Sequence, residues 1–100
     1  MTELPSFTDF ARQLNTLFCT QTAHGLIELK LIEAKELPEG SHSTQFKNPI
    51  SLIFINNSQP DMVLSQGTYR LEHPALGVLS LFVTPVLSGR PAPDYQVLIN

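Results

Sequence analysis

The stretch QGTYRLEHPALGVLSLFVTPV, residues 66–86, decides the fold of this chain. Residues 66–73 and 78–86 are rich in β-branched and aromatic side chains, and apolar and polar residues alternate from Tyr69 to Glu72. The HPALG segment between them combines a proline, which restricts φ, with a glycine, which allows the chain to turn back. We therefore predict two antiparallel strands joined as a hairpin.

An N-terminal helix is predicted over residues 6–15. Ser6 or Thr8 can cap its start, and Asp9 lies in the first turn, where a negative charge is favourable. The apolar side chains recur at helical spacing and form one stripe, made of Phe7, Phe10, Ala11 and Leu14. A helix of this length is not stable alone in water. We therefore expect the stripe to pack against a sheet.

Four more strands complete the predicted β structure. They cover residues 16–21, 26–37, 46–57 and 94–100. The alternation changes phase after Leu31, because Ile32 and Ala34 are apolar on the opposite parity, and either a β-bulge near Leu31 and Ile32 or a second buried face would explain this. No further helix of βαβ length is present, so we predict one mainly β domain over residues 1–100. Its six antiparallel strands form a small barrel or a sandwich.

Composition limits the classes of function. The chain has 100 residues, 42% of them apolar and 15% charged, which suits one domain with a core and argues against disorder. The net charge of −3 leaves no basic patch for nucleic acid. Cys19 is the single cysteine, so no intramolecular disulfide can form. The N-terminus lacks the pattern of a signal peptide, and no apolar run is long enough to span a membrane. We expect a cytoplasmic protein with no membrane partner.

No catalytic, metal or cofactor site is recognisable in the sequence. The histidines, His24, His42 and His73, fall in predicted turns or loops without metal-ligand spacing, and we interpret all three as solvated. Cys19 has no neighbouring cation that would lower the pKa of its thiol. No GxSxG motif is present. We therefore expect a protein that is not an enzyme.

The most apolar segment, residues 50–55, suggests a role in binding. It contains one polar residue, Ser51, and is either a core strand or a strand of which one face meets another chain. Edge-strand addition would be the natural mode of contact. The interface residues that we predict are Ile53 and Ile55, with Arg70, Glu72 and His73 at a rim. The expected partner is a protein, with a second copy of this chain as one option.

Two other functions remain open at this stage. The first is a small-ligand-binding barrel or enzyme with a pocket lined by aromatic residues, namely Phe18, Phe54, Tyr69 and Phe82. Six strands enclose little volume, so a ligand would need a cavity that side chains leave unfilled. The second is an immunity or inhibitor protein, which suits the size and acidity but has no sequence feature of its own.

The chain resembles DUF6916, a bacterial family of small uncharacterised proteins. The specific part of the resemblance is QGTYRLEHPALG, residues 66–77, and the flanking parts are a Thr-Asp-Phe start at Thr8, a Leu-Ser-Leu-Phe strand at 79–82 and a close at 95–100. The resemblance implies that the domain is the whole protein and that no activity is established. Association of such genes with phage-tail-collar-like proteins implies an accessory or assembly role.

Overall fold

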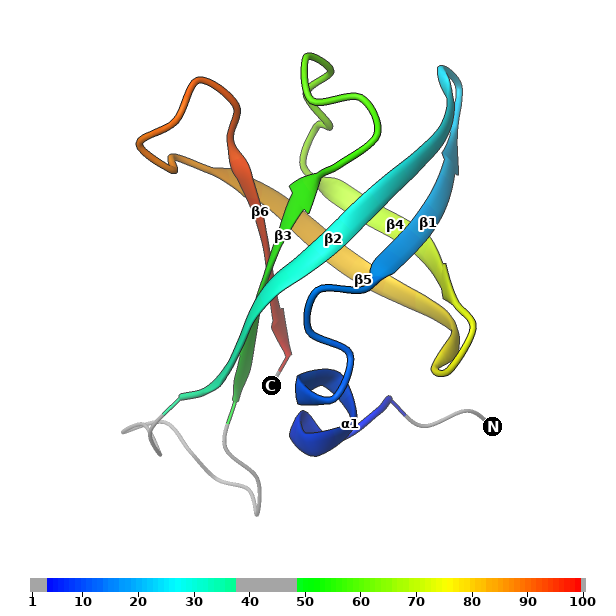
Figure 1. The fold of residues 1–100 in the computed structure, drawn as a ribbon, viewed down its shortest axis with the longest axis vertical. Coiled ribbons are helices and arrows are strands. Elements are labelled where there is room, and N and C mark those ends of the chain that lie inside the picture. The colour runs from blue at the N-terminus through cyan, green and yellow to red at the C-terminus, as the bar shows by residue number, and fades with distance from the viewer. Residues whose placement is uncertain (1–3, 38–48, 100) are drawn as a thin grey trace.

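The computed structural model describes residues 4–37 and 49–99, which form a short helix followed by six strands (Figure 1). The elements are α1 (Phe7–Ala11), β1 (Leu17–Thr22), β2 (Gly25–Glu36), β3 (Ile50–Asn56), β4 (Gly67–His73), β5 (Gly77–Val86) and β6 (Asp94–Ile99). All neighbouring strands are antiparallel, and they close into a barrel in the order β1-β2-β3-β6-β5-β4. The predicted β class and antiparallel pairing are confirmed, and of the two predicted forms the barrel is the correct one.

Closure of the sheet changes one expectation about binding. The barrel closes where β1 meets β4, through the register pair Cys19 and Glu72. Strand β3 lies between β2 and β6 and is paired with both. Its backbone groups are therefore already used, so β3 itself offers no free edge for the edge-strand addition that we expected as the mode of contact. Residues 46–48 of the predicted strand and His42 lie outside the described residues.

Inward-facing side chains from all six strands form the core. The rings of Phe18 and Phe54 pack edge to face, with centroids 5.2 Å apart, in the middle of the barrel. Around them lie further fully or almost fully buried residues: Ile27, Leu29, Leu31, Leu52, Leu71, Leu79, Leu81, Val83, Tyr95 and Val97. Burial of one such aliphatic or aromatic side chain contributes about 1.5–3 kcal/mol. The core therefore stabilises the barrel along its whole length.

The predicted hairpin and bulge are both present. Strands β4 and β5 pair from Gly67 opposite Val83 to His73 opposite Gly77, and Gly77 has the positive φ of 80° that a tight return requires. On β2, the register with β3 shifts between Leu31 and Glu33. This shift is the predicted β-bulge. It explains the change of phase without a second buried face.

Helix α1 covers one end of the barrel, which we call the helix-capped end (Figure 1). Ser6 is the N-cap and forms a capping box with Asp9, as the sequence indicated. The helix is shorter than the predicted 6–15, because the chain tightens into turns after Ala11 and Asn15 adopts a φ of 70°. Phe10 is buried as predicted. Leu14 is 37% exposed, so its predicted place in the buried apolar stripe is wrong.

The loop between β3 and β4 covers the opposite end, which we call the loop-capped end (Figure 1). Leu64 is buried in the core and Met62 packs against it. The amide of Asn56 donates to the Met62 carbonyl over 3.1 Å and accepts from the Gln59 N–H over 3.0 Å. The Tyr95 hydroxyl accepts from the Leu64 N–H over 3.1 Å. Two buried polar side chains thus fix the path of this loop.

Candidate functional site

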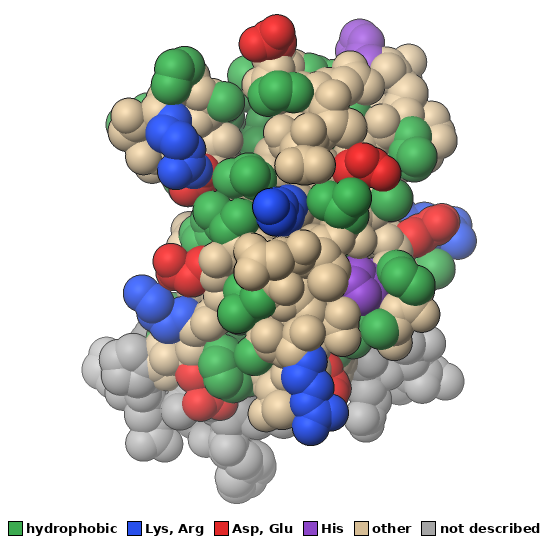
Figure 2. All heavy atoms as spheres, in the orientation of Figure 1, with side chains coloured by type: hydrophobic (Ala, Val, Ile, Leu, Met, Phe, Trp, Pro, Cys, Tyr) green, Lys and Arg blue, Asp and Glu red, His purple; other side chains and the backbone are tan. Residues whose placement is uncertain are grey.

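The outside of the barrel divides into two halves of different charge. Strands β4, β1 and β2 are neighbours and form what we call the charged wall, because β2 and β4 carry the charged residues Glu28, Lys30, Glu33, Lys35, Glu36, Arg70 and Glu72. Glu33 and Lys35 form an ion pair over 3.6 Å. Figure 2 shows charged side chains of both signs spread over the face that it presents, several of them next to one of opposite sign. These charges compensate one another locally and form no patch of one sign.

The other half, made of β3, β6 and β5, we call the charge-poor face. Its three strands contain one charged residue, Asp94, which is paired with Arg90. Three large apolar side chains on it are about half exposed: Val78 at 47%, Phe82 at 51% and Leu98 at 53%. Ile53, Ile55, Thr84 and Gln96 are partly exposed on this face, whereas Ser51 is buried. A neutral surface with exposed apolar groups loses little on desolvation, which suits it to contact with another protein.

The structure separates the five predicted interface residues. Ile53 and Ile55 are partly buried on the charge-poor face, opposite Gln96 and Lys30 of the neighbouring strands. Arg70 and Glu72 are exposed on the charged wall and approach each other to 4.0 Å. These pairs lie on strands that are not neighbours in the barrel. His73 is 6% exposed and contributes almost no surface.

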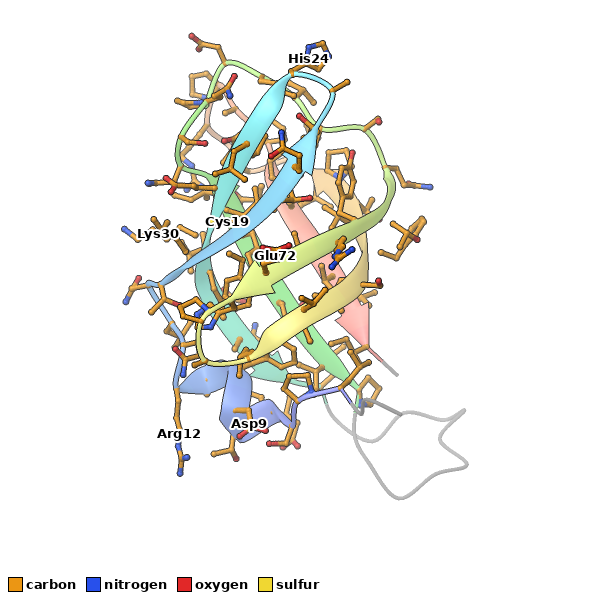
Figure 3. The ribbon with its side chains drawn as sticks, turned by 90° about the vertical axis from the view of Figure 1, so that its right-hand side faces the viewer. Asp9, Arg12, Cys19, His24, Lys30 and Glu72 are labelled. Atoms are coloured by element: carbon orange, nitrogen blue, oxygen red, sulfur yellow. The ribbon has the colours of Figure 1, made fainter. Side chains whose placement is uncertain are left out.

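Burial of His73 contradicts its interpretation as a solvated loop histidine. Its ring packs on Phe18 with centroids 4.3 Å apart. Nδ1 accepts hydrogen bonds from the backbone N–H groups of Ala75 at 3.0 Å and Leu76 at 3.3 Å. Nε2 lies 2.9 Å from the Thr16 hydroxyl oxygen. His24, by contrast, is exposed at the turn between β1 and β2, as expected (Figure 3).

These contacts assign the proton of the neutral His73 ring. A nitrogen that accepts two N–H groups carries no proton, so the proton lies on Nε2, which donates to Thr16. The Thr16 hydroxyl in turn donates to the Gln13 carbonyl over 2.7 Å. In this arrangement the ring has no free lone pair with which to remove the proton of Thr16. The pair therefore fixes structure and does not activate a nucleophile.

Cys19 lies on the charged wall, where β1 meets β4 (Figure 3). Its cross-strand partners are Glu28 on β2 and Glu72 on β4. Burial raises the pKa of the Cys19 thiol above its ordinary value, and the two carboxylates raise it further. The thiol is therefore protonated at neutral pH, which disfavours nucleophilic chemistry.

The four aromatic residues that the sequence suggested for a ligand pocket do not converge. The rings of Phe18 and Phe54 pack against each other inside the barrel and so occupy the space that a ligand would need. Phe82 points outward on the charge-poor face, so its place in a pocket is wrong. Tyr69 packs at the edge of the core and donates to the Ser65 carbonyl. An open hollow of about 440 Å³ lies elsewhere, over Ser58 to Met62 of the loop-capped end.

Within residues 4–37 and 49–99, no three His, Cys, Asp or Glu side chains come close enough to hold a metal ion. In the same part of the chain, no helix has the length and apolar character needed to cross a membrane.

Sequence reasoning missed several residues that the structure makes important. The outward positions of Phe82 and Leu98 follow from strand alternation, because Leu81 and Val83 on β5 and Val97 on β6 face the core and their immediate neighbours must face outward. Thr16 carried no comparable signal, because its contact with His73 joins residues 57 positions apart.

The architecture defines the protein as a small closed antiparallel β-barrel with one end covered by a helix and the other by a loop. A family model described as a domain of unknown function, DUF6916, matches residues 5–99, so the chain belongs to this family and the resemblance is confirmed. Comparison with curated proteins and with solved structures gives no match.

Proposed function

We propose that this protein is a non-catalytic interaction protein, with an accessory or assembly role, that binds a protein partner through the charge-poor face. The observation that carries the proposal is the contrast between the two halves of the barrel. Phe82 and Leu98 are half exposed on three neighbouring strands whose single charged residue is already paired. An apolar surface of this kind is desolvated at low cost when a partner covers it.

The partner proposed first is a second copy of this chain, because two neutral faces can meet without the repulsion that a net charge of −3 imposes elsewhere. The family resemblance adds a phage-tail-collar-like protein as a foreign partner to test, and the proposed place of action is the cytoplasm. In the revised proposal Ile53 and Ile55 belong to the interface, while Arg70, Glu72 and His73 do not.

Sedimentation over micromolar concentrations tests this proposal with a matched pair of variants. Leu98→Lys places a charge on the charge-poor face, and Leu26→Lys makes the same change at the start of β2, where Leu26 is 52% exposed. We expect the wild type and Leu26→Lys to self-associate, and Leu98→Lys to remain monomeric. Circular dichroism checks that both variants keep the β fold.

A monomeric wild type would exclude the second copy as partner. A photo-crosslinking residue placed at position 98, with position 26 as its control, then searches for a foreign partner among the proteins of the native host, starting with any phage-tail-collar-like protein. Capture of one protein at position 98 and not at position 26 supports an interaction role for this face. A monomer that captures nothing specific at position 98 contradicts the proposal.

A further inference from the structure

His73 connects segments from three parts of the chain at the helix-capped end. Its Nδ1 atom holds the turn between β4 and β5, through the N–H groups of Ala75 and Leu76. Its Nε2 atom reaches Thr16, in the connection between α1 and β1. The backbone carbonyl of Thr16 also accepts a hydrogen bond from the Leu31 N–H on β2, over 3.1 Å. The His73 imidazole thus links the β4–β5 hairpin to the α1–β1 connection directly, and to β2 through Thr16.

A second proton on the ring is incompatible with these contacts. Protonation of Nδ1 would place an N–H group against the N–H groups of Ala75 and Leu76, at separations of 3.0 and 3.3 Å. Nδ1, which now accepts from two N–H groups, would itself become an N–H donor that points at them. The ring must then leave its position or release the turn, and a ring that moves also loses Thr16 and Phe18. Burial adds a further penalty on the charged form.

No charged group among the described residues is placed to offset that penalty. Glu72 precedes His73 on β4, but it lies on the outer face and approaches Arg70. On α1, Asp9 accepts from the Ser6 N–H and Arg12 is exposed, and both point away from the barrel (Figure 3). The groups that touch the ring, from β1, the α1–β1 connection and the β4–β5 turn, are all neutral.

We propose that His73 is a pH-sensitive latch, whose protonation releases the turn between β4 and β5 and with it the connection that holds α1 over the end of the barrel. The latch is closed at neutral pH, when Nδ1 is an acceptor. It opens on acidification and uncovers the core around Phe10. The loop-capped end has no equivalent, because its anchoring side chains are Asn56 and Tyr95 and neither is a histidine.

The pH range of the effect follows from the direction of the pKa shift. Burial lowers the pKa of His73 below its ordinary value of 6.5, so an open or unfolded chain takes up the proton at a higher pH than the closed protein. The stabilisation is therefore complete above pH 6.5 and decreases as the pH falls from 6.5 towards the pKa of the closed form. Each pH unit in that interval changes the closing equilibrium by up to about tenfold.

Nuclear magnetic resonance on the whole chain tests the latch without any variant. The ring nitrogen shifts of His73 at pH 7.5 should show the proton on Nε2, and the pKa of His73 should lie below its ordinary value of 6.5. Exchange protection of the Ala75 and Leu76 amides, corrected for the intrinsic rate, should fall by up to about tenfold per pH unit below 6.5. Protection of the Leu64 amide, at the loop-capped end, should not fall in parallel.

The variants His73→Gln and His24→Gln separate the latch from general effects of acid. Glutamine at position 73 has no charge to gain, so the protection of Ala75 and Leu76 should become independent of pH between 7.5 and 5. His24→Gln should behave as the wild type. The proposal is overturned by a proton on Nδ1, by a His73 pKa at or above its ordinary value of 6.5, or by the same acid loss of protection in His73→Gln. If His73→Gln does not fold, the position of the ring proton and the pKa of His73 in the wild type still test the proposal.

Discussion

The two ends of the barrel are closed by different means. At the helix-capped end, a helix of five residues, too short to be stable alone, is held by the burial of Phe10 and by a chain of bonds through His73 and Thr16. At the loop-capped end, a loop without regular structure is held by Asn56 and Tyr95, two neutral side chains of the strands beneath it. The comparison shows that a short barrel can close both ends with polar anchors, of which one includes a histidine and the other does not.

Phe10→Ala tests how far the helix-capped end depends on burial. The substitution should lower the free energy of unfolding by about 3–5 kcal/mol, because it removes a fully buried ring and leaves a cavity beneath α1. Urea unfolding followed by circular dichroism measures the change. Leu64→Ala, the matched truncation at the loop-capped end, should lower it by about 2–5 kcal/mol. A loss below about 1 kcal/mol for Phe10→Ala would show that the barrel does not need its helix.

Tyr95→Phe tests the anchor of the loop-capped end. It removes the hydroxyl that accepts from the Leu64 N–H and keeps the ring, so it should lower the free energy of unfolding by about 1–3 kcal/mol. Urea unfolding at pH 7.5 and pH 5 should give the same difference from the wild type, because the substitution leaves His73 and its contacts at the helix-capped end unchanged. A difference that depends on pH would contradict the contrast between the two ends.

Ser6→Ala tests the local start of α1. The variant loses the bond from the Asp9 N–H to the Ser6 hydroxyl and should lower the free energy of unfolding by about 1 kcal/mol. Ser6→Asp is the control, because an aspartate at the N-cap accepts the same bond. Equal stability of both variants would mean that tertiary contacts alone position the helix.

Arg70→Ala should have the smallest effect, because the residue belongs to neither end. Its guanidinium approaches Glu72 to 4.0 Å on an exposed part of the charged wall, and such pairs contribute about 0–1 kcal/mol. A double-mutant cycle with Glu72→Ala measures the coupling. A coupling above about 2 kcal/mol would show that the join between β1 and β4, where Glu72 pairs with Cys19, depends on this ion pair.

Much of the fold could be predicted from local pattern. The hairpin at 66–86, the bulge beside Leu31 and the cap at Ser6 all follow from interactions within a few residues or between sequential strands. The end of α1 was not predictable in the same way, because the apolar stripe continues to Leu14 while the chain has already turned towards β1. The pattern shows which residues suit a helix, and packing against the barrel decides where it stops.

The candidate site also shows a difference between what the local sequence pattern predicts and what the packing of the strands decides. The apolar run places Ile53 and Ile55 on one face of a strand by alternation, and the structure has both partly buried on the outer side of β3. Phe82 was placed in a pocket because aromatic side chains are usually buried, although its parity on β5 pointed outward. The distance between the two predicted parts of the interface depends on strand order, which no local pattern contains.

The sequence by itself determined the class of fold, the positions of the six strands and the family, because these depend on side-chain periodicity, turn residues and a specific motif. Three features depend on tertiary structure: the sheet closes into a barrel, all but one of the charged strand residues lie on one half of its wall, and His73 is buried. Each of these rests on contacts between residues distant in the chain. Closure joins β1 to β4, and the environment of His73 includes Thr16, 57 residues earlier. The sequence identifies position 73 as a histidine in a turn, whereas the exposure and protonation of that ring depend on the segments that pack around it.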